Sequence, residues 1–383
     1  MLITSQKALE EFCAGLRSET FLTVDTEFLR EKTYYPKLCL VQIGAADGRA
    51  AAVDPLAEGI DLAPVYDLLF NPDILKIFHA ARQDLEIFYN LTGKVPAPLF
   101  DTQIAAMVCG YGEQVGYEAL VRDITDGNID KSVQYTNWSV RPLSDVQVEY
   151  ALGDVTHLVK IYEHLRDKLE ARGRTHWVFE EEAVLNDPAT YAAPVEDVWQ
   201  RVKVKSPKPQ TLAVLKALAA WREVRARKKD IPKNWVMRDE TLADMAARCP
   251  KDVKGLKKIR NMSDKVAEGN SGAEILKLIK DALASDPAGW PAVTKKKPPS
   301  ARVTAITEIL RMLLKIRAAE EGVAAKLIAT PADLEGVAKD DAADVAVLSG
   351  WRREIFGEDA LRLKNGEIAI GLKDGRIAVI ETS

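Results

Sequence analysis

Two acidic residues stand one position apart at the end of an apolar run near the N-terminus. Residues 21–24 have the composition of a buried strand, and Asp25 and Glu27 follow them with Thr26 in between. Side chains two apart on a strand share a face, and like charges there repel each other unless a cation lies between them. The spacing therefore suggests a metal site. Taken alone, so short a motif is more simply explained by a strand that ends at Val24, with both acids solvated.

Three more residues of suitable chemistry fall in helical patterns. Asp84 lies where a strand runs into an amphipathic helix, and it flanks the apolar stripe of that helix. Tyr150 and Asp154 are four apart on another predicted helix, so a phenol and a carboxylate can address one site. Singly, Asp84 is explained as a surface acid and Tyr150 as a core residue. Four acids and a tyrosine in one domain are harder to explain by accident, and carboxylates suit hard ions such as Mg²⁺ or Mn²⁺.

The elements that must position these residues lie in the first half of the chain. Residues 1–205 alternate short β-rich runs with helical patterns, which predicts an α/β domain with a mixed sheet flanked by helices. A Pro and Lys stretch at 203–209 breaks this pattern, so we expect a domain boundary near residue 205. Helical patterns fill residues 206–290, and a Lys- and Pro-rich linker at 291–302 follows them.

The last part of the chain, residues 303–383, echoes the first helical part when the sequence is shifted by 92 positions. Leu218 then falls on Leu310, for example, and most of the matches are apolar positions at helical spacing. A duplication is expected from this, although two similar amphipathic helices would give some of the matches by chance. Strand-like alternation on both sides of an Asp-Gly turn predicts a β-hairpin at the end of the chain.

Charge is distributed unevenly along the chain, although the formal net charge is only −4. Residues 1–200 carry 17 Lys and Arg against 32 Asp and Glu, residues 201–300 carry 24 against 11, and residues 301–383 carry 12 against 14. The balances are therefore −15, +13 and −2. A phosphate-binding surface needs such a local excess of positive charge, but a Lys-rich solvated helix face would give the same count. Composition alone leaves nucleic-acid binding open.

The sequence argues against several other kinds of site. The four cysteines stand far apart, and none of the four histidines pairs with them at zinc spacing, so neither a disulfide framework nor a zinc finger is expected. No stretch approaches the roughly eighteen apolar residues that a membrane-spanning helix needs. We therefore expect a cytoplasmic protein without membrane association, and no obligate protein partner is evident.

The three acidic segments together resemble the motifs of the DEDD exonucleases, which have a ribonuclease H-like fold. The match is to the branch with a tyrosine in the third motif. Asp25 and Glu27 correspond to the first motif, Asp84 to the second, and Tyr150 with Asp154 to the third.

Further matches narrow the resemblance to the bacterial ribonuclease D family. They are HAARQDL at residues 79–85, around the second motif, and WSVRPL at residues 138–143, before the third. Residues 206–290 resemble the helicase-and-ribonuclease-D C-terminal (HRDC) domain, and residues 303–383 resemble a degenerate second copy with a terminal hairpin that departs from the family. The resemblance thus implies a ribonuclease H-like exonuclease domain followed by one or two all-α HRDC-type domains.

This resemblance implies a 3′→5′ exoribonuclease that releases nucleoside 5′-monophosphates from RNA with a free 3′ hydroxyl, with tRNA precursors as expected substrates. Two Mg²⁺ or Mn²⁺ ions would be held by four acids. Asp25 would bridge both ions, Glu27 and Asp154 would complete the site of the ion that binds the water, and Asp84 would hold the second ion mainly through waters. Tyr150 would orient the attacking water, because a phenol with a pKa of about 10 is a poor base at neutral pH.

Contacts to the substrate are expected at two places. Thr26, Phe28 and His79 are candidates for the terminal nucleotide, each with simple packing as the alternative. Trp235 offers a stacking surface unless it belongs to a core. The rival interpretations are a DNA exonuclease, which would use the same acids, and a catalytically silent RNA-binding protein. The expected RNA-binding surface of the helical domain consists of Arg222, Arg225, Lys228, Lys229, Lys257 and Lys258.

Overall fold

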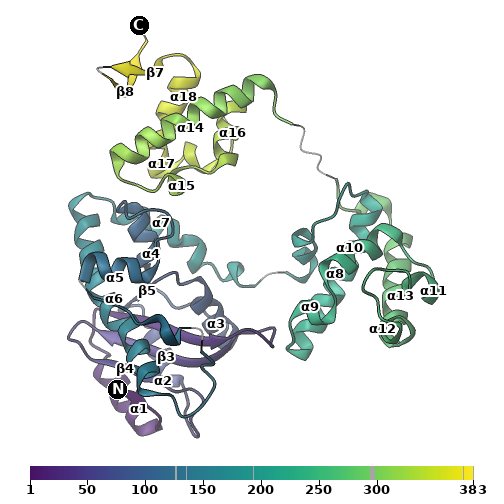
Figure 1. The fold of residues 1–383 in the computed structure, drawn as a ribbon, viewed down its shortest axis with the longest axis horizontal. Helices are drawn as coiled ribbons and strands as arrows, with labels where there is room; N and C mark the ends of the chain where they lie inside the picture. Colours follow the sequence, from purple (N-terminus) through teal and green to yellow (C-terminus); the bar gives the residue numbers. More distant parts are fainter. Residues whose placement is uncertain (126, 135, 193, 294–297, 374, 383) are drawn as a thin grey trace.

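Six strands form a mixed sheet in the order β1-β4-β3-β2-β5-β6 (Figure 1). The computed structural model describes residues 1–125, 127–134, 136–192, 194–293, 298–373 and 375–382. β3 is antiparallel to both of its neighbours, and the remaining pairs are parallel. The sheet confirms the expected α/β architecture. Its strands are β1 (Leu2–Ile3), β2 (Phe21–Leu29), β3 (Lys37–Ala45), β4 (Ala50–Val53), β5 (Leu75–Phe78) and β6 (Leu99–Asp101).

Helices cover both faces of this sheet, because side chains along a buried strand alternate between its two sides. Leu22 and Val24 of β2 lie in an apolar cluster with α1, α2 and α3, whereas Phe21 lies in a second cluster with α4 to α7. The first group is α1 (Gln6–Gly15), α2 (Ala63–Leu69) and α3 (Arg82–Thr92). The second group is α4 (Thr102–Val108), α5 (Tyr117–Thr125), α6 (Asp145–Ala171) and α7 (Thr175–Asn186).

The first helical region has a core of its own. Leu215, Leu218, Leu242 and Ile275 belong to this core, and Val198 from the preceding short helix η3 (Val195–Arg201) joins them. The segment just before the expected boundary near residue 205 therefore packs with the helices that follow the boundary. The helices of this region are α8 (Pro209–Lys229), α9 (Lys233–Val236), α10 (Asp239–Arg248), α11 (Val253–Leu256), α12 (Asp264–Glu268) and α13 (Asn270–Ala284).

The second helical region repeats the beginning of the first. Its helices α14 (Ala301–Glu321), α15 (Ala325–Ile328) and α16 (Pro331–Lys339) start 92 residues after α8, α9 and α10, the shift at which the two sequences match. The later elements differ, and the region ends in a two-stranded sheet, as expected. Asp374 of the predicted turn and residues 294–297 of the predicted linker lie outside the described residues. The later elements are α17 (Gly350–Arg352), α18 (Glu358–Lys364), β7 (Ile368–Lys373) and β8 (Arg376–Glu381).

The two helical regions contact the α/β region in different ways. Leu310, Ile328 and Trp351 of the second region share one apolar cluster with Trp177 and Leu165 of the α/β region. The core of the first region contains no residue from the sheet or from α1 to α7 among those described. The second region is thus docked through a common core, whereas the first meets the α/β region through polar groups. Within the described ranges, we find no helix long and apolar enough to cross a membrane.

Candidate active site

The central strand β2 carries the first two acids. It extends to Leu29, past the acids, so the alternative in which the strand ends at Val24 is wrong. Asp25 and Glu27 share the face that is covered by α6, and a bulge between Glu27 and Phe28 interrupts the pairing with β3 directly after them. Bulges redirect the side chains around them and are frequent beside active sites.

Helix α6 carries the third motif to the same face. It begins with a capping box formed by Ser144 and Gln147, which fixes its first turn. Asp154 falls in the stripe of α6 that faces the sheet and is buried, between the buried residues Ala151 and Val155. The carboxylate is therefore held in the interface of helix and sheet, where it is partly removed from water.

A close contact of α6 with β2 and β3 determines how near α6 lies to the sheet that carries the acids. The hydroxyl of Thr23 donates a 2.8 Å hydrogen bond to the carbonyl of Val155, next to Asp154. Gly44, opposite Thr23 on β3, has no side chain, and a Cβ there would lie 2.5 Å from the Thr23 hydroxyl and 3.1 Å from the Val155 carbonyl. Only glycine lets the helix approach so closely.

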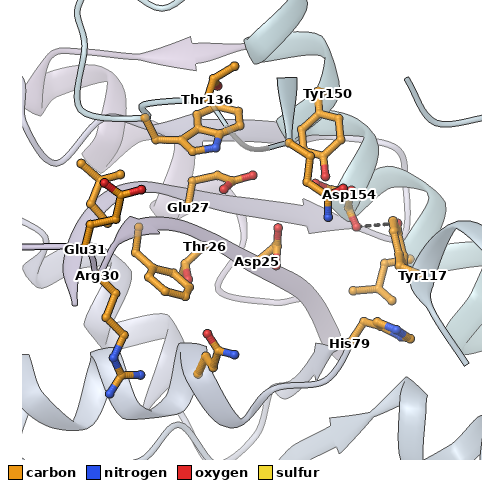
Figure 2. Close-up of a pocket in the computed structure, with 16 residues that line it drawn as sticks. Asp25, Thr26, Glu27, Arg30, Glu31, His79, Tyr117, Thr136, Tyr150 and Asp154 are labelled. Carbon is orange, nitrogen blue, oxygen red and sulfur yellow. Dashed lines mark hydrogen bonds between the residues drawn. The ribbon is translucent and has the colours of Figure 1, made fainter. Parts of the chain in front are cut away.

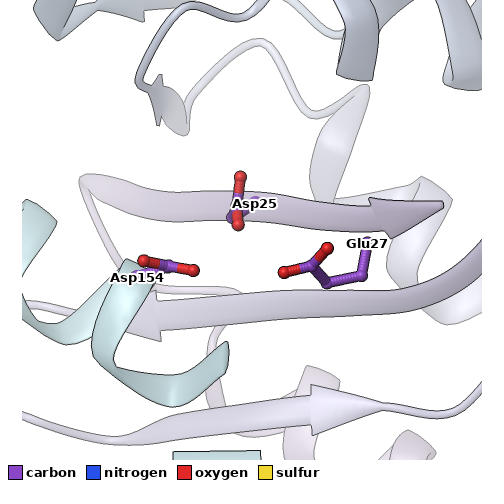
Figure 3. A group of neighbouring side chains, drawn as sticks. All are labelled: Asp25, Glu27 and Asp154. Carbon is purple, nitrogen blue, oxygen red and sulfur yellow. The ribbon is translucent and has the colours of Figure 1, made fainter. Parts of the chain in front are cut away.

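Asp25, Glu27 and Asp154 come together in one cluster. Each offers a carboxylate oxygen, and these oxygens all lie within 4.8 Å of one another (Figure 3). None of the three forms an ion pair with Lys or Arg among the described residues. The cluster is therefore a concentration of like charge with no protein cation to balance it.

Asp84 lies beside this cluster and approaches from the opposite face of the sheet. It is on the first turn of α3, is 7% exposed, and accepts a hydrogen bond from the hydroxyl of Thr26. The start of α3 is fixed by Asp101 at the end of β6, whose carboxylate accepts hydrogen bonds from the backbone N–H groups of Ala80 (3.0 Å) and Ala81 (2.9 Å). Thr26, a candidate substrate contact, thus uses its hydroxyl to orient Asp84.

A cavity of about 610 Å³ opens over the acids (Figure 2). Phe28 and His79 line it, as expected for contacts to a terminal nucleotide, and Nδ1 of His79 lies 3.0 Å from the Thr102 hydroxyl. Tyr150 lines it as well, and its ring centroid is 6.1 Å from that of the buried Trp138. All predicted site residues of the α/β region except Asp84 therefore line one cavity, although the hydroxyl of Thr26 is directed to Asp84.

The cavity also contains residues that the sequence did not single out. The clearest is Tyr117, at the first position of α5, whose hydroxyl donates a 2.6 Å hydrogen bond to the backbone carbonyl of Asp154. It stands in a stretch without any motif, so no local pattern indicates it. Trp138 is part of a matching motif, but its place in the cavity wall follows only from the fold.

Burial and mutual repulsion shift the pKa values of the acids upward. Burial is the largest cause at Glu27, where repulsion by Asp25, Asp154 and Asp84 adds to it and the pKa rises to about 10. Burial also raises the pKa of Asp25 to about 6. The pKa of Asp154 is raised by burial and by Asp25, although a hydrogen bond from Tyr150 acts in the other direction. Without a cation the fold therefore favours the protonated forms of these acids, and a bound cation is what would make the ionised forms favourable.

These shifts predict how stability depends on pH and metal. A carboxyl whose pKa is raised in the folded state keeps its proton where the unfolded chain has lost it, so stability falls as pH rises through that window. The window begins near the ordinary value of 3.8 for Asp25 and extends to about 10 for Glu27. We expect the metal-free protein to melt at a lower temperature at pH 8 than at pH 5, and Mg²⁺ to raise the melting temperature more at pH 8.

Calorimetry of the wild type and of Asp25→Asn checks this expectation. The variant lacks one of the repelling charges, so its metal-free melting temperature at pH 8 should exceed that of the wild type and should respond less to Mg²⁺. Equal responses of the two proteins to Mg²⁺ at pH 8 would show that the cluster holds no ion.

The expected RNA-binding residues of the first helical region fall into two groups. Arg222 is 2% exposed, and its guanidinium donates to Asp239 (2.6 Å) and to the carbonyl of Met237 (2.9 Å), so it stabilises the region and is removed from the expected surface. Arg225 pairs with Glu274 and Lys257 with Glu268, whereas Lys228, Lys229 and Lys258 are exposed without an ion pair among the described residues. Trp235 is 62% exposed, so the alternative that placed it in a core is wrong.

Comparison with known proteins places this geometry in a family. Residues 1–170 match the 3′-5′ exonuclease family and residues 211–279 match the HRDC domain. The chain is 46% identical to ribonuclease D of Granulibacter bethesdensis, over 100% of this chain and 96% of that protein. It is 45% identical to ribonuclease D of Nitrobacter hamburgensis over the full length of both.

The fold of this chain is similar over nearly its whole length to that of a solved structure. RNase D of Escherichia coli, an exoribonuclease involved in structured RNA processing, superposes with a TM-score of 0.83 at 28% identity and covers 96% of this chain and 98% of its own. The likeness therefore extends over the α/β region and both helical regions. The chain belongs to the ribonuclease D family of 3′-5′ exoribonucleases.

Proposed function

We propose that the cavity hydrolyses the 3′-terminal phosphodiester of an RNA strand and releases a nucleoside 5′-monophosphate with the help of two Mg²⁺ or Mn²⁺ ions. The observation that carries this proposal is the cluster of Asp25, Glu27 and Asp154, whose oxygens lie within 4.8 Å of one another in the wall of an open cavity. Asp84 stands behind Asp25 and adds to the negative charge there. Oxygen ligands of this kind suit hard divalent cations.

The residues present fit such ions. Protein carboxylates that approach so closely and lack a basic partner need a cation to remain ionised together. Asp25 raises the pKa of Glu27, Asp154 and Asp84, so it is the acid that adjoins all the others. This position supports a central role for Asp25 in holding the ions, which Glu27, Asp154 and Asp84 would hold together with it. Such ions, when bound, would supply an activated water, neutralisation of charge on the phosphate and support for the departing oxygen.

The remaining groups of the cavity bind and orient. Tyr150 faces the cavity and lowers the pKa of Asp154, so its phenol is placed to orient the attacking water. Tyr117 holds the backbone of Asp154 through its 2.6 Å hydrogen bond and thereby keeps that carboxylate in place. Phe28 and His79 offer an aromatic wall and a polar edge to the last nucleotide. Thr26 acts through Asp84.

The proposed substrates are RNAs with a free 3′ hydroxyl, including tRNA precursors and other structured RNAs. The likeness to the Escherichia coli exoribonuclease over nearly the whole chain supports this proposal. The acids alone do not distinguish RNA from DNA, because only contacts to the 2′ hydroxyl do so. The division of labour that we propose puts hydrolysis in residues 1–205 and RNA binding in residues 206–290, with a degenerate second copy in residues 303–383.

A direct assay tests the proposed function. The full chain is incubated with end-labelled RNA and DNA of one sequence, with Mg²⁺ or with a chelator. We expect mononucleotides from the RNA only when metal is present, and faster release from RNA than from DNA. Faster release from DNA would favour a DNA exonuclease. Binding of RNA without any metal-dependent release would favour a silent RNA-binding protein.

A further inference from the structure

A second cavity, of about 460 Å³, lies between the α/β region and the first helical region. One wall is formed by the loop after β2 and by α3, and the other by the end of α8 and by α9, with η3 between them. We call this cavity the interdomain cleft and define it by Arg82 of α3, Arg201 of η3 and Lys233 of α9.

The interdomain cleft carries positive charge that the protein does not balance. Arg82, Arg201 and Lys233 form no side-chain hydrogen bond or ion pair among the described residues. The two acids that line the cleft, Glu86 and Glu223, are already occupied by other arginines. Unpaired charges of one sign in a concave site attract counter-ions strongly. The occupied pairs are Arg30 with Glu86 (2.7 Å), Arg227 with Glu223 (3.0 Å) and Arg222 with Asp239 (2.6 Å).

The interdomain cleft adjoins the cavity that holds the acids. Arg30 lines both cavities, and Figure 2 shows its side chain extending away from Asp25 and Glu27. Helix α3 also borders both cavities, because Gln83 lines the acidic cavity whereas Arg82 and Glu86 line the cleft. A strand that leaves the acidic cavity on this side therefore meets the cleft next.

Polar contacts hold the two walls of the cleft together. The carboxylate of Asp230, at the end of α8, accepts 3.0 Å hydrogen bonds from the backbone N–H groups of Tyr34 and Tyr35 in the loop after β2. The hydroxyl of Tyr34 donates to Glu223 and accepts a 3.1 Å hydrogen bond from Arg227. These bonds tie the loop after β2 to the end of α8, and Arg82, Arg201 and Lys233 line the one cavity between these two walls.

We infer that the interdomain cleft binds phosphates of the RNA strand on the 5′ side of the nucleotide that is removed. This inference rests on the proposed function, because it assumes that the 3′ end occupies the acidic cavity. A polyanion passing out of that cavity needs cations to hold it, and single-stranded sites combine such cations with exposed aromatic rings. Trp235 follows the cleft residues Lys233 and Asn234 in α9 and is 62% exposed, so it offers a base-stacking surface at the rim.

The test compares two triple variants with the same loss of charge. The cleft variant is Arg82→Gln, Arg201→Gln and Lys233→Gln. The control is Lys216→Gln, Lys265→Gln and Lys280→Gln, which removes three exposed cations of the first helical region that do not line the cleft. Binding of a fluorescent 20-nucleotide RNA is measured against salt in an Asp25→Asn background, and hydrolysis of dinucleotide and 20-nucleotide RNA is measured with Asp25 intact.

We expect the cleft variant to bind the 20-nucleotide RNA at least tenfold more weakly than the control. Its salt slope should be shallower by about 2, because each phosphate contact to a single strand contributes about 0.7. The ratio of kcat/KM for the long RNA to that for the dinucleotide should fall at least tenfold. Trp235→Ala should weaken binding of the long RNA about tenfold without changing the salt slope.

Other outcomes overturn the inference in distinguishable ways. Equal losses of RNA affinity in the cleft variant and the control would mean that only the overall positive charge of the first helical region contributes to binding. Unchanged binding in the cleft variant, with an unchanged melting temperature, would mean that the cleft lies off the path of the RNA. Failure of the wild type to release mononucleotides from either RNA would instead contradict the proposed function, whatever the cleft variant binds.

Discussion

Replacing Asp25 with Asn is expected to lower kcat for RNA by at least about 1000-fold while the protein stays folded. The change keeps the volume of the side chain and removes the charge of the acid that adjoins Glu27, Asp154 and Asp84. Loss of metal-ion stabilisation amounts to several kcal/mol, and about 1.4 kcal/mol corresponds to a factor of ten in rate. Asp154→Asn should have the same effect. Single-turnover hydrolysis of end-labelled RNA at saturating Mg²⁺ measures it.

Tyr150→Phe is the matched control for this prediction. The variant keeps the ring beside Trp138 and removes only the hydroxyl that we propose orients the water. It should therefore slow the reaction less, by roughly 100-fold, the lower end of what a side chain positioned for proton transfer contributes. Complete loss in Asp25→Asn, Asp154→Asn and Tyr150→Phe alike would show that the phenol takes a direct part in proton transfer. Substantial activity in Asp25→Asn would contradict the assignment of the cluster.

Much of the site was accessible from the sequence because its residues follow local periodicities. Asp25 and Glu27 share a face by the period of a strand, and Tyr150 and Asp154 share one by the period of a helix. Resemblance to a family then joined these segments with Asp84. The structure brings Asp25, Glu27 and Asp154 within 4.8 Å and buries Asp84 beside them. Local patterns give only the direction of a side chain along one element, and the family resemblance was needed to select the acids and join them into one candidate site.

Other features depend on where distant elements meet, and no periodicity reveals them. Tyr117 reaches Asp154 from a different helix, 37 residues away in sequence. Arg222 stands in a basic run that indicates a surface, yet it is buried against Asp239. Thr26 was a candidate for the substrate, but the opposite face of β2 directs its hydroxyl to Asp84. Charge counts and motifs describe single residues. Each of these three roles depends instead on a contact between two residues that are distant in sequence, so the sequence alone does not show it.

The domain boundaries that we expect from the sequence rest on local composition. The hydrophobic cores of the structure group the residues differently. Val198 and Val202 precede the Pro and Lys stretch and still lie in the core of the first helical region. The second helical region shares its core with α4, α6 and α7 of the α/β region. The second helical region is distant in sequence from those helices, but its apolar side chains and theirs form one hydrophobic core. We therefore propose that residues 303–383 stabilise the exonuclease.

The contact that carries this proposal is a pair of stacked tryptophans. Trp177 of α7 and Trp351 of α17 have ring centroids 4.6 Å apart with their planes inclined by 14°. Trp351 is 2% exposed, and its indole N–H donates a 3.2 Å hydrogen bond to Glu181, which also accepts from Arg352 at 2.5 Å. Removing such a ring from a shared core leaves a cavity and an unpaired face on Trp177.

Trp351→Ala should therefore destabilise the protein by about 3–5 kcal/mol, as large-to-small changes of buried aromatic residues do. The loss should appear in the melting of the α/β region itself, because the two regions have one core. Calorimetry with saturating Mg²⁺ measures it, since an ion held by the proposed metal site would stabilise the α/β region selectively and so mark the transition that belongs to it. Trp351→Phe keeps part of the stacking and should lose less.

Trp235→Ala is the control, because it removes the same side chain from a position that is 62% exposed and should change stability by no more than about 0.5 kcal/mol. The informative result is which unfolding transition in the calorimetric scan shifts to lower temperature in Trp351→Ala. If Trp351→Ala lowers only a separate transition that Mg²⁺ does not shift, the second helical region folds independently and merely rests on the exonuclease. If the Mg²⁺-dependent transition moves with it, the acids of β2 and α6 depend for their position on α17, which lies far beyond both elements in sequence.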